Sequence, residues 1–472
     1  MPSSRSARSS RLTARAVRLV LLGLLLAALA GCPSLRPWVN PPLTARMESP
    51  ALPIDPAQER DPSLLVVVAL SGGGARAAAF GYGVLDALRD TRFVWNGRPT
   101  SLLDETDLVS GVSGGSIVAA YLAAFGSEGL AGFERDYLRH NFQNSLIGHA
   151  LRPASLHALS SPWLGRSHLL AQRLDDLYRG RTFGELPNRL GHPNLLITAT
   201  DLSLGTAFEF TPDQFDLLCS RLADVPLSFA VAASSAVPLV LSPMTLHNHR
   251  AHCLWSDATR TERQPELEDY RARLVQEQER SYLDAAARPY IHLVDGGLSD
   301  NLGLRRLLDR ALAGESLGWQ LVRGAAPART AVRRLVLIAV NSERDPSVNI
   351  DTSDRLPGIP QVVDSLLFGT GARATKETQA FLTDVARRWQ AELAARAAIG
   401  GDVFARDAEL HVIQVNLRDA ADEPTRRRLL QIPTAFSVGP AEVTELIEAG
   451  RRVLQASPQF QALLKGLAPQ AP

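Results

Sequence analysis

Two segments of this sequence share one pattern, in which an apolar run ends in a glycine-rich turn and a helix-like stretch follows. The first run, residues 64–70, is continuously apolar, as is typical of a strand buried on both faces of a sheet, and the alanine-rich residues 76–89 follow its glycines. The second unit spans residues 106–125 and has Ser113 at its turn. A repeated strand, turn and helix predicts an α/β fold with a mostly parallel sheet.

Later parts of the chain continue this alternation, so we expect one domain over residues 61–460 and a tail at 461–472. A polar insertion at about residues 244–289 is expected to form a charged surface helix, with a lid over the site as the alternative. Residues 432–437 are expected to form the closing edge of the sheet. The later apolar runs that predict strands are residues 194–200, 290–294, 333–340 and 409–415.

The N-terminal residues have the features of an export signal. Five arginines and no acidic residue precede an apolar run at residues 19–30, which is shorter than the roughly 20 residues that a membrane-spanning helix needs. The run ends in Leu29-Ala30-Gly31-Cys32, which resembles the bacterial lipobox. We expect residues 1–31 to be removed and Cys32 to be lipidated, with an ordinary signal peptide as the alternative. The expected location is then the bacterial cell envelope, with the proline-rich residues 32–60 as a tether or an extended wrap.

The net charge and the cysteines bear on the expected binding partners, on a disulfide and on a metal site. The formal net charge is +1, and about −4 without residues 1–31, so a nucleic-acid partner is not expected. Cys219 and Cys253 can form a disulfide in an oxidising compartment or remain two buried thiols, and their spacing does not decide between these. We expect no metal and no cofactor, although His247, His249, His252 and Cys253 form a loose cluster. The oligomeric state is not indicated.

The turn Gly111-Val112-Ser113-Gly114-Gly115 marks Ser113 as a candidate nucleophile. The Gly-x-Ser-x-Gly spacing exposes a hydroxyl on a strained turn, where side chains at the flanking glycines would clash with neighbouring elements. The serine needs a base. His411 is the only histidine after Asp295 and lies within a predicted strand, so an ordinary triad fits poorly. Asp295 follows a buried run and precedes two glycines, so it is the candidate base, with a turn cap as the alternative.

A second glycine-rich turn supplies candidate donors for an oxyanion. Ser71-Gly72-Gly73-Gly74-Ala75-Arg76 precedes a predicted helix, and the amides of Gly72, Gly73 and Gly74 can bind the negative oxygen formed when a serine attacks a carbonyl. Gly114, directly after Ser113, adds a further amide. Arg76 has two open roles, which are pairing with a substrate phosphate and bracing the loop.

Together these three motifs, in this order, resemble the patatin-like phospholipase family. The resemblance implies a three-layer α/β sandwich and a Ser-Asp dyad without histidine, with Ser113 as nucleophile, Asp295 as base and the glycine loop as oxyanion hole. It also covers residues 199–202 and 233–238, which are expected to support the site. Ala77 departs from the glycine that many members have after the arginine, which leaves the geometry of the loop open.

The expected function is hydrolysis of a lipid ester through an acyl-enzyme on Ser113. Membrane phospholipids or lysophospholipids are the expected substrates, and Cys32 would anchor the protein beside them. Two alternatives remain open at this point. One is a non-catalytic lipoprotein that binds lipid or a partner, and the other is an acyltransferase that uses the same acyl-enzyme.

Overall fold

The computed structural model has a main mixed sheet with helices on both faces. It describes residues 35–43, 60–253, 270–305, 308, 331–344, 350–351, 354–365, 370–397, 404–420 and 422–467. The predicted signal peptide, Cys32, most of the predicted tether, part of the polar insertion and the last tail residues lie outside these ranges. Within them, no helix has the length and apolar character needed to cross a bilayer.

The strands of the main sheet follow the order β10-β9-β1-β4-β5-β8-β7, and β6 pairs with β5. These strands are β1 (Leu64–Leu70), β4 (Thr106–Val112), β5 (Asn194–Asp201), β6 (Thr206–Glu209), β7 (Met244–His247), β8 (Tyr290–Val294), β9 (Val332–Asn341) and β10 (Phe404–Asn416). Two further strands, β2 (Arg92–Trp95) and β3 (Arg98–Ser101), pair with each other in a separate antiparallel sheet. The described α-helices are α2 (Gly74–Asp90), α3 (Gly114–Gly129), α4 (Phe142–Ala150), α5 (Pro153–Ala158), α6 (Arg166–Tyr178), α7 (Pro212–Leu217), α8 (Leu227–Ser234), α10 (Tyr270–Leu283), α13 (Ile359–Asp364), α14 (Thr370–Ala397), α15 (Glu423–Leu430), α16 (Pro440–Ala456) and α17 (Pro458–Leu467).

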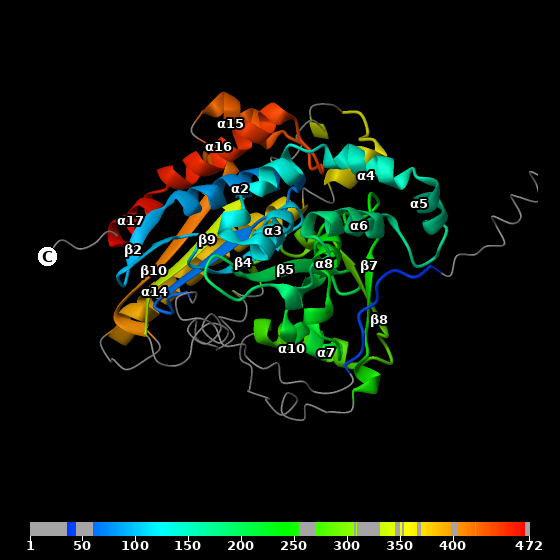
Figure 1. The fold of residues 1–472 in the computed structure, drawn as a ribbon, viewed down its shortest axis with the longest axis horizontal. Helices are drawn as coiled ribbons and strands as arrows, with labels where there is room; N and C mark the ends of the chain where they lie inside the picture. The colour runs from blue at the N-terminus through cyan, green and yellow to red at the C-terminus, as the bar shows by residue number, and fades with distance from the viewer. Residues whose placement is uncertain are drawn as a thin grey trace, which may run out of the picture.

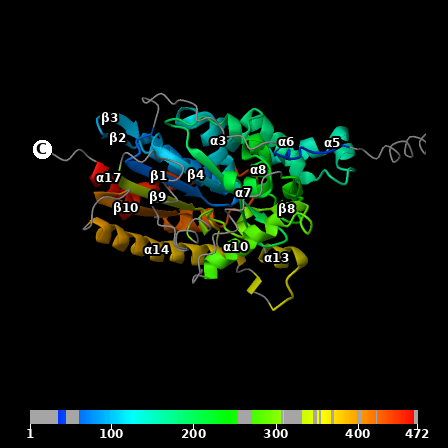
Figure 2. The same cartoon turned by 90° about the horizontal axis from the view of Figure 1, so that it is seen from below.

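Alternation along β1 creates the two cores of a three-layer sandwich. Leu64, Val66 and Val68 belong to the larger core, which contains the side chains of α2, α3 and α16. Leu65 and Val67 point the other way, into a smaller core under α14. Figures 1 and 2 show these helix layers on opposite faces of the sheet. The predicted α/β sandwich with a mostly parallel sheet is therefore confirmed.

The direction of β8 differs from the expectation. β10, β9, β1, β4 and β5 are parallel, but β8 pairs antiparallel with β5. Val112, the last residue of β4, is level with Thr198, so β5 extends beyond the edge where β4 ends. β8 pairs with this extension in reverse, with Val294 opposite Thr200. Asp295, the residue after Val294, therefore lies near the end of β4.

Two other expectations about the C-terminal half are corrected. The polar insertion does not begin at Met244, because β7 is a strand of the main sheet and pairs with β8. Its helix α10 is also more than a solvated surface helix, since Tyr282 is fully buried and its hydroxyl donates to Asp201. Residues 432–437 form no strand, and they lie in the loop between α15 and α16.

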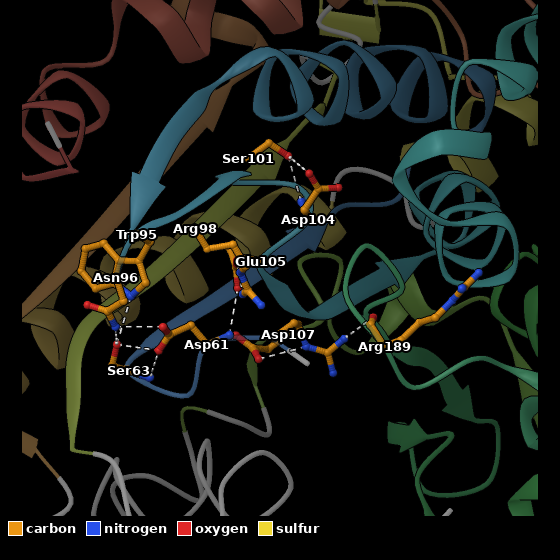
Figure 3. A network of polar contacts seen from close by, with 11 residues as sticks. Asp61, Ser63, Trp95, Asn96, Arg98, Ser101, Asp104, Glu105, Asp107 and Arg189 are labelled. Atoms are coloured by element: carbon orange, nitrogen blue, oxygen red, sulfur yellow. Dashed lines mark hydrogen bonds and ion pairs between the residues drawn. The ribbon is translucent and has the colours of Figure 1, made fainter. Parts of the chain in front are cut away.

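A polar network holds β1 and β4 together at their N-terminal ends, which lie opposite to the glycine turns (Figure 3). Asp107 Oδ2 accepts the Val66 N–H at 2.8 Å, and the β1–β4 register shifts at this residue. Arg60 pairs with the same carboxylate at 3.2 Å, and Glu105 accepts the Asp61 N–H at 3.0 Å. Burial raises the pKa of Asp107 to about 7. These contacts anchor the start of β1 far from the glycine turns.

The N-terminal segment at residues 35–43 wraps along the body, as one of the two sequence interpretations expected. Asn40 exchanges hydrogen bonds with the backbone of His247 at 2.9 and 2.8 Å, and Trp38 contacts Phe229 with ring centroids 4.8 Å apart. Beside it, Cys219 and Cys253 are joined by a disulfide. The bridge settles the question that the sequence left open.

Replacing both cysteines with alanine should lower the free energy of unfolding by about 3–4 kcal/mol, because the bridge spans a separation of 34 residues in the unfolded chain. Denaturant unfolding of the parent and the Cys219→Ala, Cys253→Ala variant measures the difference. A reductant should shift the parent midpoint to that of the variant and leave the variant unchanged. Equal midpoints would contradict the expectation.

Candidate active site

Ser113 lies on a strained turn between β4 and α3. Its φ is 49° and its ψ is −121°, a left-handed conformation that is unfavourable for a residue with a side chain. A Cβ on Gly111 would lie 2.5 Å from Ser116 Cα, and one on Gly115 would lie 2.4 Å from Leu70 O. Both distances are too short for a methyl group. The predicted need for glycine on both sides of Ser113 is therefore confirmed.

Ser234, at the end of α8, holds the backbone of this turn. Its hydroxyl accepts the Ser113 N–H at 2.8 Å and donates to Thr198 O at 2.6 Å. The serine turn is thereby tied to β5. Because the Ser113 amide is occupied, it is not a donor for a bound substrate.

Asp295 follows β8, and its backbone is fixed on both sides. Its N–H donates to Ala236 O at 3.0 Å, and its carbonyl oxygen accepts the Thr200 hydroxyl at 2.8 Å. The carboxylate accepts the Gly297 N–H at 2.8 Å, and the Ser113 side chain acts to lower its pKa. The structure thus brings the two predicted reacting residues together, and segments 199–202 and 233–238 support them.

The environment of Asp295 makes its carboxylate a stronger base. Burial raises the pKa to about 6, while the hydrogen bonds from Gly297 and Ser113 act in the opposite direction. A base of this strength is ionised at neutral pH and still able to take a proton.

The glycine loop after β1 is held by distant segments. The Gly72 N–H donates to Asn301 O at 3.1 Å, so this amide is occupied, and the expectation that Gly72 is an oxyanion donor is corrected. Gly73 and Gly74 have φ of 140° and 61°. No hydrogen-bond acceptor for their amides, or for that of Gly114, lies among the described residues. These three amides remain the candidate oxyanion donors.

Gly114 packs directly against the loop. A Cβ on Gly114 would lie 2.0 Å from Gly74 O, so the two turns touch through their backbones. The Ala75 N–H donates to Ala435 O at 2.7 Å. Residues 432–437 thus back the glycine loop, a role that their sequence did not indicate. Ala77 is buried beneath the loop and does not line the pocket.

Arg76 braces the loop from inside the protein. The side chain is 2% exposed, its Nε donates to Ser342 O at 2.9 Å, and its Nη1 donates to Ile432 O. Burial lowers the pKa of Arg76 to about 9. These contacts support the bracing role, and its role in binding substrate stays a prediction.

Ser113 and Asp295 line one pocket, which contains about 590 Å³ of empty space and is partly open to solvent. Several of its residues were not singled out from the sequence as pocket residues, because distant segments deliver them. Burial raises the pKa of one of these, Glu343, to about 7. Val237 and Pro238 belong to segment 233–238, which was expected to support the site, whereas the pocket residues that sequence reasoning missed include Leu298, Asn301, Glu343, Arg344 and Thr434.

No histidine is among the described residues that line this pocket. His411 lies in β10, as its sequence predicted, and its Nε2 is 3.2 Å from Glu409 Oε2. Two members of the loose cluster near Cys253 have other contacts. Cys253 forms the disulfide, and His249 contacts Asn40 O at 2.8 Å. Within the described residues, no group of side chains could hold a metal ion.

The family model described as patatin-like phospholipase matches residues 68–308, slightly more than half of the chain. No curated protein sequence gives a significant match.

Solved structures of other proteins are also similar to this chain, and three of these proteins are the following. Human GIVD cytosolic phospholipase A2 is 13% identical, covering 86% of this chain and 62% of that one, with a TM-score of 0.42. VipD from Legionella pneumophila is 13% identical over 93% and 72% of the two chains, with a TM-score of 0.31. ExoU from Pseudomonas aeruginosa is 15% identical over 87% and 94%, with a TM-score of 0.24. The chain spans less than two thirds of the human enzyme, and at these scores the three likenesses carry no argument about activity.

Asp295→Asn should stabilise the protein in a pH-dependent way. In the folded protein the pKa is about 6, against 3.8 for the free group, so ionisation opposes folding as the pH rises through this interval. The gain in free energy of unfolding should be close to zero below about pH 4 and reach about 3 kcal/mol above about pH 6. Denaturant unfolding across this range measures it. The exposed control Asp176→Asn should show no such gain, and a gain independent of pH for Asp295→Asn would contradict the assignment.

Proposed function

This chain belongs to the patatin-like phospholipase family, and we propose that it is a serine hydrolase that cleaves carboxylic esters of phospholipids or lysophospholipids. Family membership supports lipid hydrolysis in general. The finer proposal rests on one observation: Ser113 and the buried carboxylate of Asp295 line the same pocket, where the Ser113 side chain acts on the pKa of that carboxylate.

In the proposed first step, Ser113 Oγ attacks the ester carbonyl and its proton passes to Asp295. The carbonyl oxygen becomes negative and is bound by the amides of Gly73, Gly74 and Gly114. The bond to the leaving alcohol then breaks, and Asp295 returns the proton to that oxygen. The products are a free alcohol and an acyl group on Ser113.

Water completes the cycle. A water molecule gives a proton to Asp295 while its oxygen attacks the acyl carbon, and the bond to Ser113 Oγ breaks. The proton on Asp295 then restores the serine hydroxyl, and the fatty acid leaves. One carboxylate thus serves each step in turn as base and acid.

Ser113→Ala and Asp295→Asn should each reduce hydrolysis of a short-chain ester by about a thousandfold or more, because each removes an essential half of the dyad. His411→Gln is the control and should keep the parental rate. A fluorophosphonate should label Ser113 in the parent. Near-parental rates in either dyad variant, or an unlabelled serine in the parent, would refute the proposal.

We further propose that the protein is exported and anchored to a membrane through lipid on Cys32. The support is the sequence of residues 1–32 alone. Cells supplied with a labelled fatty acid should incorporate it into the parent, and Cys32→Ser should abolish both the label and the membrane association. Equal labelling of the two proteins would contradict this anchor.

A further inference from the structure

We propose that one face of the protein lies on the lipid bilayer and is held there by apolar side chains and anionic headgroups. This membrane-facing surface consists of residues 35–36, α4 and α5 with the turn at Leu151 and Arg152, residues 161–166, and residues 239–240. The inference rests on the proposed function, because it states how the pocket of a lipid hydrolase meets its substrate.

Large exposed apolar side chains gather on this surface. Single exposed apolar residues are normal, but a contiguous group of them marks an interaction site. Of the sixteen large apolar side chains that are exposed among the described residues, seven belong to this face. They are Leu35, Ile147, Leu151, Leu156, Trp163, Leu239 and Val240, each between 44% and 69% exposed.

Contacts between distant segments make the surface continuous. The Ser161 hydroxyl donates to Leu35 O at 2.8 Å, and the Arg36 guanidinium lies 3.9 Å from the centre of the Trp163 ring. Arg166 donates to Leu239 O at 2.8 Å, which joins the start of α6 to the loop between α8 and β7. Figure 1 shows the N-terminal segment ending beside α5.

The surface leads to the pocket. Val237 and Pro238, immediately before Leu239, line the pocket together with Ser113 and Asp295. A lipid leaving the bilayer at Leu239 would therefore pass along apolar side chains to the nucleophile. Its acyl chains would not have to pass through water.

The charge of the surface identifies the partner. Residues 142–166, from α4 to the start of α6, contain two arginines and two histidines but no aspartate or glutamate, although at the chain's average frequency two or three acidic residues would be expected. Arg152, His157 and Arg166 are exposed. Apolar side chains fringed by cations are typical of proteins that bind anionic membranes. A second copy of this surface would instead meet like charges in a symmetric dimer.

The first described residue, Leu35, lies on this same face. Leu35 lies three residues after Cys32, and three extended residues span at most ~10 Å. A lipid anchor on Cys32 would therefore hold Leu35 close to the bilayer. The proposed attachment point and the apolar, cationic surface coincide, although they are separate observations.

A pair of activity measurements tests this surface. The double variant Leu156→Ser, Trp163→Ser of the full chain should hydrolyse phosphatidylcholine vesicles containing phosphatidylglycerol about tenfold more slowly. The reason is that two apolar side chains which would insert into the bilayer are lost. Hydrolysis of a soluble short-chain ester should be unchanged. The control pair Val94→Ser with Leu274→Ser, exposed apolar residues elsewhere, should keep both rates. Arg152→Glu should remove the rate increase that phosphatidylglycerol gives.

The outcomes separate the two proposals. A parent without soluble-ester activity refutes the proposed function. A parent that hydrolyses the soluble ester, with a surface variant that matches it on vesicles, overturns the membrane-facing surface while leaving the dyad intact.

Hydrogen exchange on the parent protein decides the matter if the double variant fails to fold. Addition of the same vesicles should slow exchange in residues 147–166 and 239–242 and leave β2 unaffected. Protection of β2 by the vesicles would overturn the proposal. Protection of the membrane-facing surface that increases with protein concentration in the absence of vesicles would also overturn it and would indicate self-association.

Discussion

The pairing of the Ser113 hydroxyl with the buried carboxylate of Asp295 in one pocket is the interaction on which the rest of the site depends. A serine hydroxyl is a weak nucleophile, and a solvated carboxylate is a weak base. Burial strengthens the base, and the strained turn at Ser113 presents the hydroxyl to it. Both features are unfavourable for folding, so surrounding contacts must hold them in place.

Those contacts come from segments that are distant in the sequence. Ser234 ties the Ser113 amide to β5, and Thr200 and Ala236 fix the backbone of Asp295. The glycine loop depends on residues 342, 432 and 435, which lie beyond the region matched by the family model. The C-terminal part of the chain is therefore a component of the site as well as a cover for the sheet.

The sequence was sufficient for the parts of the structure that short patterns encode. Continuous apolar runs predicted the central strands, and glycines flanking Ser113 predicted its turn, because each depends on local backbone geometry. The antiparallel direction of β8 was missed, since a buried run looks the same in either direction. Asp295 nevertheless lies at the edge of the sheet where β4 ends, because β8 runs back toward that edge. The occupied Gly72 amide and the position of residues 432–437 arise from tertiary contacts and left no local signal.

The pH dependence of fluorophosphonate labelling at Ser113 tests the central claim most directly, because it reports the base before any product forms. The account predicts that the rate constant rises with pH through one ionisation near pH 6, the pKa of Asp295. Glu343→Gln and His411→Gln should retain that ionisation. An ionisation that disappears when a histidine or Glu343 is replaced, or full reactivity in Asp295→Asn, would contradict a carboxylate that acts on the serine directly.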